Sequence, residues 1–321
     1  MNYHTWKINV SDQGVNPDFF YYALRHLTEF IEENAHGASA LVHTQKWEME
    51  GFDVAIPPRT SEQEAIAQAL SDVDASITAL SRLIAKKRDL RQGAMRRLLT
   101  GQTRLPGFTA PWQERPLGDL VDTDPENLGA DTNPNLLFNY IALEDVNRGR
   151  LRGWTDQQFI SAPSRARRRL RNRDVLFATV RPNLQAHLLF NEQSDQDVWV
   201  CSTGFCVLRC KSGVADPAFI FAQLFGPSIP VQIEKLIAGS NYPAVNSGDV
   251  RGLWIGAPEP DEQTAIAGVL SDIDAELAAV EARLNKTRAL KQAMMQALLT
   301  GRVRLPVRRG TAPQAKDAAH A

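Results

Sequence analysis

The chain has 321 residues, of which 43% are apolar and 23% are charged, and its formal net charge is -1 at pH 7. This length and composition indicate a globular protein of about two domains, because domains usually contain about 100–200 residues. Residues 1–10 lack the basic and apolar stretches of an export signal, and no apolar run reaches the ~18 residues of a membrane span, so we expect a cytoplasmic location.

Two long stretches of the chain are copies of one another, displaced by 200 residues. Residues 61–106 read SEQEAIAQALSDVDASITALSRLIAKKRDLRQGAMRRLLTGQTRLP, and residues 261–306 read DEQTAIAGVLSDIDAELAAVEARLNKTRALKQAMMQALLTGRVRLP. A weaker match lies upstream, between residues 16–19 (NPDF) and 216–219 (DPAF). An internal repeat of this kind predicts one architecture used twice.

Each copy of the repeat has the spacing of one long helix. Its apolar residues recur at alternating steps of four and three, as in a coiled-coil seam. Ser61 and Glu64 form a capping-box pair at the first start, and Gly101 supplies a stop. The expected helix over residues 62–99 would be about 57 Å long at ~1.5 Å per residue, so it needs a partner helix. The seam residues are Ile66, Leu70, Val73, Ile77, Leu80, Ile84, Ile266, Leu270, Ile273, Leu277, Val280 and Leu284.

Any long helical bundle or a dimeric coiled coil would bury the same seam. Two copies within one chain favour an antiparallel pair formed by the chain itself. Between the copies, residues 174–180, 198–201 and 205–208 are rich in strand-forming residues. A helical stretch follows over residues 219–236, and we expect it to be interrupted at Gly226-Pro227 and at Pro230. We therefore expect an α/β (α+β) fold, in which a mixed α/β domain accompanies two long helices packed as an antiparallel coiled coil.

The globular part contains a dense run of arginines. Residues 147–173 hold nine arginines and one acid, Asp156, which gives a local charge of 9 - 1 = +8. Such a run can bind several phosphates, although a solvated charged surface is the alternative. The candidate phosphate-binding residues are Arg165, Arg167, Arg168, Arg169 and Arg171.

Three polar residues after a predicted strand are candidates for reading bases. Arg181, Asn183 and Gln185 carry side chains that can make paired hydrogen bonds to guanine or adenine edges, and ordinary loop polarity is the alternative. His187 is more simply explained as a packed core residue, so we give it no role. Cys201, Cys206 and Cys210 lack a second CxxC pair or a histidine cluster, so we expect thiols and no metal site.

Several segments resemble one protein family. They are Glu62-Gln63, residues 98–108 (LLTGQTRLPGF), residues 140–146 (YIALEDV), residues 173–183 (RDVLFATVRPN) and residues 239–245 (GSNYPAV). With the repeated helices, they resemble the conserved regions and target recognition domain of Type I restriction-modification specificity subunits. The resemblance covers residues 16–306 and places DNA-facing loops at Ser240, Asn241 and Tyr242, where a purely structural turn is the alternative.

The resemblance implies an order of domains along the chain. Residues 1–57 match only the C-terminal part of a first target recognition domain, without counterparts of residues 117–215. The remaining parts are a first conserved helix (58–105), a complete second target recognition domain (106–257), a second conserved helix (258–305) and a disordered tail (306–321). The truncation is either real or the result of a start assigned too far downstream.

The resemblance also implies a function and partners. In that family each recognition domain reads half of a split sequence in double-stranded DNA, while the helices space the halves and hold methyltransferase subunits. S-adenosylmethionine, ATP and Mg²⁺ belong to the methyltransferase and restriction subunits, so no cofactor is expected in this chain. A second copy of the chain is another candidate partner, and no membrane is expected.

Two other functions were weighed. A methyltransferase or nuclease would need a glycine-rich cofactor loop, an Asn/Asp-Pro-Pro-aromatic motif or a metal-binding carboxylate cluster, and the sequence has none of these motifs. We therefore expect a non-catalytic chain. The remaining alternative is an assembly remnant that keeps the helices without reading a bipartite DNA sequence.

Overall fold

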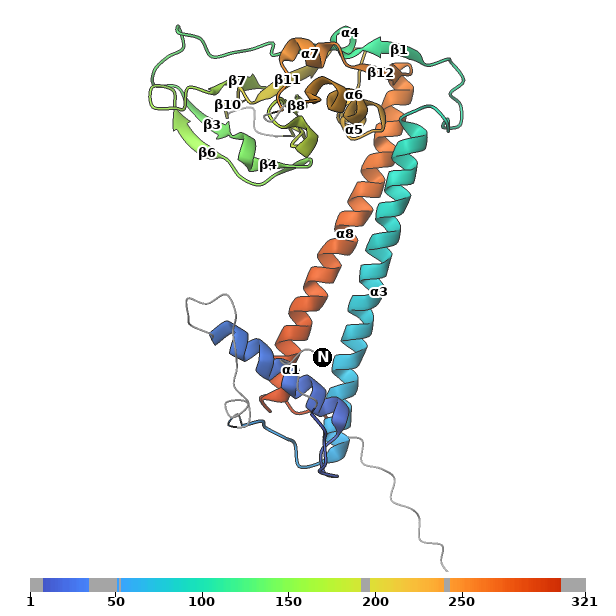
Figure 1. Ribbon diagram of the computed structural model, residues 1–321, viewed down its shortest axis with the longest axis vertical. Coiled ribbons are helices and arrows are strands. Elements are labelled where there is room, and N and C mark those ends of the chain that lie inside the picture. The colour runs from blue at the N-terminus through green and yellow to red at the C-terminus, as the bar shows by residue number, and fades with distance from the viewer. Residues whose placement is uncertain (1–7, 35–50, 52, 192–196, 240–242, 307–321) are drawn as a thin grey trace, which may run out of the picture. The chain divides into compact units, whose positions relative to one another are not determined.

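The structure is a computed structural model that describes residues 8–34, 51, 53–191, 197–239 and 243–306 (Figure 1). The chain divides into two compact units, one of residues 1–86 with 278–321 and one of residues 87–277. Within the described residues, no helix is both long enough and apolar enough to cross a membrane. Residues 307–321, in the tail that was expected to be disordered, lie outside the described residues.

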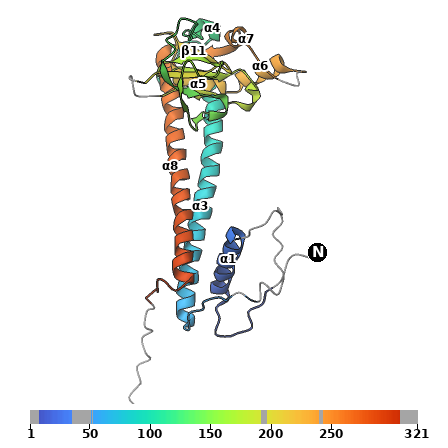
Figure 2. The ribbon, with the colours of Figure 1, turned by 90° about the vertical axis from the view of Figure 1, so that its left-hand side faces the viewer.

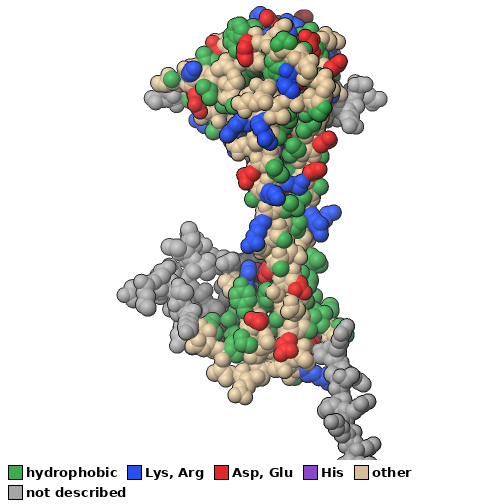
Figure 3. Space-filling model, turned by 90° about the vertical axis from the view of Figure 1, so that its right-hand side faces the viewer, with side chains coloured by type: hydrophobic (Ala, Val, Ile, Leu, Met, Phe, Trp, Pro, Cys, Tyr) green, Lys and Arg blue, Asp and Glu red, His purple; other side chains and the backbone are tan. Residues whose placement is uncertain are grey.

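The two units share two long helices, α3 (Thr60–Leu98) and α8 (Pro260–Leu299). They run side by side in both views of the ribbon, with charged side chains on their outer surfaces (Figures 1, 2 and 3). In residues 87–277, Lys87 pairs with Glu276 and Arg91 pairs with Asp274, so residue numbers rise along one helix as they fall along the other. The expected antiparallel packing of two long helices is confirmed. The helix starts and ends also lie within two residues of the predicted positions.

The coiled-coil seam lies along the inner faces of these helices. Ile66, Leu70, Leu80 and Ile84 of α3 are buried. In α8, Ile266, Leu270 and Leu284 are buried. The five other seam residues of the two helices are half-buried, namely Val73 and Ile77 in α3 and Ile273, Leu277 and Val280 in α8. Removing these side chains from water contributes about 25 cal/mol per Å² of apolar surface, which offsets the entropy lost in ordering the helices.

The unit of residues 1–86 and 278–321 is built around α1 (Pro17–Asn34). The side chain of Asn16 caps this helix by accepting a hydrogen bond from Phe19 N at 2.9 Å. Phe19 is fully buried, and it packs in one cluster with Ile66 and Leu70 of α3 and with Met295 of α8. Lys291 is only 9% exposed, and its charge is compensated by Asp74 at 2.7 Å.

Residues 87–277 form three layers. The outer layer is a four-stranded sheet in the order β6-β3-β10-β7, in which β3 and β10 are parallel and the other pairs are antiparallel. The middle layer is an antiparallel sheet in the order β2-β11-β8-β9. The strands of the outer sheet are β3 (Leu137–Ile141), β6 (Thr155–Gln158), β7 (Ala166–Leu170) and β10 (Trp199–Ser202), and those of the middle sheet are β2 (Val121–Thr123), β8 (Val175–Ala178), β9 (Leu188–Leu189) and β11 (Phe205–Cys210).

The middle sheet is buried on both faces, which explains the unbroken apolar runs of its central strands. In β8, Leu176 packs in the cluster shared with the outer sheet, whereas Phe177 packs in the cluster shared with the helices. The helices are α4 (Leu117–Leu120), α5 (Pro217–Leu224), α6 (Ser228–Ile237) and α7 (Ser247–Arg251). Two short pairs complete the unit, β1 (Gln113–Pro116) with β12 (Trp254–Ala257) and β4 (Val146–Asn147) with β5 (Arg150–Leu151), together with two 3-10 turns, η1 (Leu143–Asp145) and η2 (Pro182–Leu184).

The mixed α/β fold class is therefore confirmed. The three predicted strands correspond to β8, β10 and β11. The helical stretch predicted over residues 219–236 is divided at Gly226-Pro227 as expected, into α5 and α6, whereas Pro230 lies within the first turn of α6 and does not interrupt it.

The repeat extends to contacts that the sequence did not single out. Gln63 is fully buried at the start of α3, where its amide donates to Gly14 O at 2.9 Å and Pro57 O at 2.8 Å and accepts from Asn16 N. At the start of α8, Gln263 donates to Val214 O at 3.1 Å and Pro258 O at 2.9 Å, and it accepts from Asp216 N. Each glutamine thus ties the start of its long helix to the residue that precedes a shorter helix, α1 or α5.

Candidate nucleic-acid interface

The three predicted base-reading residues belong to one short loop around η2. Arg181 and Gln185 flank η2 in left-handed backbone conformations, with φ of 48° and 56°. Arg181 and Asn183 are exposed, while Gln185 is half-buried. The loop is anchored beside the segment after residue 242, since Arg181 N donates to Pro243 O at 2.8 Å. Left-handed conformations are disfavoured for non-glycine residues and cluster at functional sites.

The hairpin of β4 and β5 lies against this loop. Its two turn residues, Arg148 and Gly149, both have positive φ, 46° and 85°. Arg148 Nη2 donates to the side-chain oxygen of Gln185 at 3.2 Å, and Gly149 N donates to His187 O at 2.9 Å. The structure therefore brings Arg148, which the sequence analysis counted only as a charge, beside the predicted base readers. An Arg-Gly pair between two short β-prone stretches was the signal for this turn.

His187 supports the loop from beneath. Its ring is fully buried between Phe177 and Phe225, at centroid distances of 4.5 and 5.6 Å. Ala178 N donates to His187 Nδ1 at 3.1 Å, so the neutral ring carries its proton on Nε2. Burial lowers the pKa of His187 to about 3. This residue packs as a neutral core histidine, in keeping with its lack of an assigned role.

A groove of about 390 Å³ lies beside the loop and the hairpin. Leu143, Val146 and Val180 give it an apolar floor, and Glu144 and Arg181 add charged groups to its lining. Leu184 also lines it and is 59% exposed. Exposed polar and apolar groups on a well-anchored loop can match the hydrogen-bonding edges and methyl groups of bases.

The arginine run occupies β7 and the loops at its two ends. Arg165 is exposed, and Arg167 lies 5.0 Å from the ring centre of Phe159. Arg168 has a side chain that is 22% exposed, which pairs with Asp124 at 3.1 Å and donates to Asn127 Oδ1 at 2.8 Å. Its guanidinium thus helps to hold the segment that follows β2 against β7.

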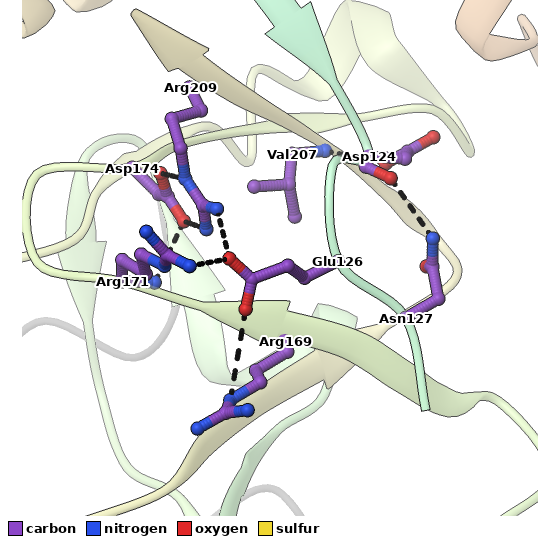
Figure 4. Close-up of polar contacts among 8 residues, drawn as sticks. All are labelled: Asp124, Glu126, Asn127, Arg169, Arg171, Asp174, Val207 and Arg209. Atoms are coloured by element: carbon purple, nitrogen blue, oxygen red, sulfur yellow. Dashed lines mark hydrogen bonds and ion pairs between the residues drawn. The ribbon is translucent and has the colours of Figure 1, made fainter. Parts of the chain in front are cut away.

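Glu126 lies among three arginines, Arg169, Arg171 and Arg209 (Figure 4). It pairs with Arg171 and with Arg209, and Arg169 Nε lies 3.9 Å from its carboxylate. Burial opposes ionisation of Glu126, but the hydrogen bond from Arg209 and the three positive charges outweigh it and lower the pKa of the carboxyl. Arg209 also pairs with Asp174 at 2.7 Å.

Acids from elsewhere in the chain thus offset much of the local charge counted from the sequence. The count of +8 covered residues 147–173, whereas Asp124, Glu126, Asp174 and Asp216 lie outside that window and pair with its arginines or with Arg209. Arg169 and Arg171 remain 52% and 67% exposed. The three other predicted DNA-facing residues, Ser240, Asn241 and Tyr242, lie outside the described residues.

The cysteines lie in the sheets. Cys201 is in β10 and Cys206 and Cys210 are in β11, and all three are free thiols. Burial raises the pKa of Cys206 and of Cys210 to about 12, which leaves them protonated and unreactive. Among the residues that the structure describes, no group of three or more histidine, cysteine or acidic side chains is placed to hold a metal ion.

The sequence of this chain is similar to those of known proteins. Residues 1–87 match the family model of the type I restriction modification DNA specificity domain. The chain is 22% identical to the type I restriction enzyme MjaVIII specificity subunit of Methanocaldococcus jannaschii, over 93% of this chain and 73% of that protein. It is 24% identical to the HindI specificity subunit of Haemophilus influenzae over 55% of this chain, and the match spans 38% of that relative.

A solved structure has a similar fold. It is the crystal structure of the Type-I restriction-modification system S subunit from M. genitalium, with a TM-score of 0.58 and 17% sequence identity. The match covers 91% of this chain and 75% of that chain. At this identity the likeness establishes the fold alone, and it supports the description of an α/β unit with two long helices.

Proposed function

Because the chain belongs to the family of type I restriction-modification specificity subunits, we propose that it is the sequence-specific DNA-recognition component of such a complex. It is a non-catalytic chain that directs methyltransferase and restriction subunits to a double-stranded DNA target. The methyltransferase subunit would use S-adenosylmethionine, and the restriction subunit would use ATP and Mg²⁺. A complex that acts on chromosomal DNA works in the cytoplasm.

One observation carries this proposal, namely that the same contacts start both long helices. The Gln63 and Gln263 contacts correspond at an offset of 200. The ion pairs Glu62–Arg304 and Glu262–Arg104 correspond when the two copies are exchanged, because each pair joins the glutamate of one copy to the arginine of the other. The chain thus repeats a junction between a globular segment and a long helix. Two such junctions in one chain suit a subunit that carries two recognition modules and docks its partners on the helices.

The domain boundaries are part of the proposal. All strands among the described residues lie between Gln113 and Ala257, which supports residues 106–257 as a complete target recognition domain. We assign residues 1–57 to the C-terminal part of another such domain, because α1 repeats the capped start of α5, where the Asp216 side chain accepts from Phe219 N. Residues 58–105 and 258–305 are the conserved helices.

Within residues 106–257 we assign two kinds of DNA contact. Arg165, Arg167, Arg169 and Arg171 bind phosphates, with Arg168 contributing mainly through its position in β7. The η2 loop, with Arg181, Asn183 and Gln185, reads base edges. Ser240, Asn241 and Tyr242, which lie outside the described residues, are assigned to DNA contact from the family resemblance alone. Phosphate contacts fix the register on DNA, whereas contacts to base edges give the sequence preference.

Co-purification with the methyltransferase subunit of the same system, followed by DNA binding at several salt concentrations, tests the proposal. We expect a stable complex whose DNA affinity falls as salt rises, because bound arginines release counterions from the phosphates. A complex that forms but selects no DNA sequence would support the assembly remnant instead. A complex containing two copies of the chain would identify the second copy as a partner. Binding to neither the subunit nor DNA would refute the assignment.

A further inference from the structure

We propose that Arg148, in the turn between β4 and β5, reads a guanine edge in DNA, and that Gln185 is the positioning residue that holds its guanidinium. This inference rests on the proposed function, because it adds a residue to the DNA-reading surface of residues 106–257. It also changes the role of Gln185, which the sequence alone suggested as a base reader.

Arg148 is an unusual residue for the turn between β4 and β5. A two-residue hairpin turn with positive φ at both positions favours Asn-Gly or Asp-Gly. Gly149 meets a local requirement, since its φ is 85° and a Cβ there would approach Phe221 Cζ at 3.1 Å. Arg148 meets no such requirement, because it is exposed and its φ of 46° is disfavoured for residues with a Cβ other than asparagine and aspartate. An unfavourable residue on a tight turn points to a role for its side chain.

Gln185 holds the side chain of Arg148 in one direction. The guanidinium of Arg148 donates through Nη2 to the side-chain oxygen of Gln185, which is itself half-buried and left-handed. Two residues in disfavoured conformations therefore meet through their side chains. The amide leaves four of the five guanidinium N–H groups for other acceptors, and an oriented guanidinium can bond guanine O6 and N7 together.

The contact with Gln185 leaves the positive charge of Arg148 in place. Arg168 and Arg209 in the same unit are paired with carboxylates, Asp124 and Asp174, which offset their charges. The partner of Arg148 is a neutral amide, so this contact orients the guanidinium without reducing its charge. A charged donor with a fixed direction suits recognition of an electron-rich base edge.

The backbone around Arg148 is anchored to the core. Gly149 N is bonded to the carbonyl of the buried His187, and the Cβ position of Gly149 faces Phe221 of α5. The hairpin and the η2 loop are thus fixed to the same core, and Arg181 and Asn183 are exposed on that loop. Base reading needs such support, because errors of about 1 Å break paired hydrogen bonds.

Arg148→Asn in the full chain tests the inference, with selection from a random double-stranded DNA library. This change supplies a residue type that the turn favours, so the melting temperature should stay equal or rise. Discrimination at one guanine-containing base pair should fall by about 5- to 150-fold, with preferences elsewhere unchanged. Arg148→Lys should keep overall affinity better than Arg148→Asn but lose the same preference, because lysine keeps the charge and lacks the paired donors.

Two changes at Gln185 test the positioning role. In Gln185→Asn the side chain is too short to reach Arg148, so discrimination at the same base pair should decrease although Arg148 is intact. Gln185→Glu keeps an oxygen at the original length and should retain that preference with weaker overall binding. A wild-type preference profile in both variants would overturn the positioning role.

The outcomes separate this inference from the proposed function. If the wild-type chain selects a motif and Arg148→Asn selects it with the same discrimination, Arg148 does not read a base. If Arg148→Asn lowers the melting temperature and weakens binding to all sequences equally, the turn is structural and the inference fails. If the wild-type chain selects no motif, the proposed function fails and the inference fails with it. Arg171→Ala is the matched control, because a phosphate contact should weaken all sequences alike.

Discussion

Residues 87–277 should lose stability at acidic pH, because the buried His187 stays neutral while the same residue in the unfolded chain binds a proton. Its ring is fully buried, and burial lowers its pKa from 6.5 to about 3. Above pH 6.5 the folded and unfolded states are both neutral at this residue, so its contribution is fully present. Below pH 6.5 the unfolded chain binds a proton at His187, whereas the folded chain stays neutral there until about pH 3. The free energy of unfolding therefore decreases as the pH is lowered from 6.5 to about 3.

The size of the effect follows from the gap between the two pKa values. At ~1.4 kcal/mol per pH unit the full loss is about 5 kcal/mol, of which about 2 kcal/mol falls between pH 8 and pH 5. His187→Asn removes this titration, while its side-chain oxygen can still accept from Ala178 N. The cavity left by the smaller side chain costs about 2 kcal/mol at every pH.

Urea unfolding followed by tryptophan fluorescence measures the loss. Four of the six tryptophans, Trp112, Trp154, Trp199 and Trp254, lie in residues 87–277. The difference in unfolding free energy between wild type and His187→Asn should shrink by about 2 kcal/mol from pH 8 to pH 5. Subtracting the variant removes the titration of other groups. A difference that stays constant over this range would refute the reasoning.

Three further substitutions separate binding from stability. Arg171→Ala, at a side chain 67% exposed, should change stability by less than about 0.5 kcal/mol and reduce the log-log salt slope of DNA binding by about 1, measured by fluorescence anisotropy. Arg168→Ala leaves Asp124, only 10% exposed, without its charged partner and should cost about 2 kcal/mol in urea unfolding; a cost near zero would contradict its structural role. Gly149→Ala places a Cβ 3.1 Å from Phe221 at a φ of 85° and should cost about 1–2 kcal/mol, whereas an unchanged melting temperature would show that the turn adapts.

The long helices could be predicted because their signals are local and occur twice. A seam with alternating steps of four and three defines a helix face, and glycines mark the ends of the helices. The predicted capping box at Ser61 is wrong, because α3 begins at Thr60 and Ser61 lies inside the helix. The strand β8 was also readable, since its run Val175–Ala178 is buried on both faces and therefore has no polar alternation.

The charge balance of the arginine run could not be predicted from a sequence window. Asp124 and Glu126 reach it because the segment that follows β2 pairs with β7, where Asn127 forms an antiparallel bridge with Arg168 and Arg169 N donates to Glu126 O at 3.0 Å. Asp124 N donates to Val207 O, and Val207 N donates to the Asp124 carboxylate at 2.9 Å, which holds this segment in place. Contacts between segments that are distant in the sequence thus determine which arginine charges are offset by carboxylates.

The contact between Arg148 and Gln185 was hidden for the same reason. The turn at Arg148 and Gly149 is legible as a short hairpin, but the hairpin and the η2 loop are separated by β6, β7 and β8 in the chain. Only the folded unit shows that Gln185 holds another residue. A polar residue in a candidate interface can therefore serve its neighbour and make no direct contact with the ligand.

The most direct test of DNA recognition is selection from a random double-stranded DNA library, with the chain bound to its methyltransferase subunit and the retained fraction sequenced at increasing salt. One complete recognition domain predicts a single enriched half-site, whose enrichment over random sequence persists while nonspecific binding falls with salt. A split motif would mean that residues 1–57 or a second copy of the chain also reads DNA. Retention of DNA without any enriched sequence, or no retention at all, would contradict the account.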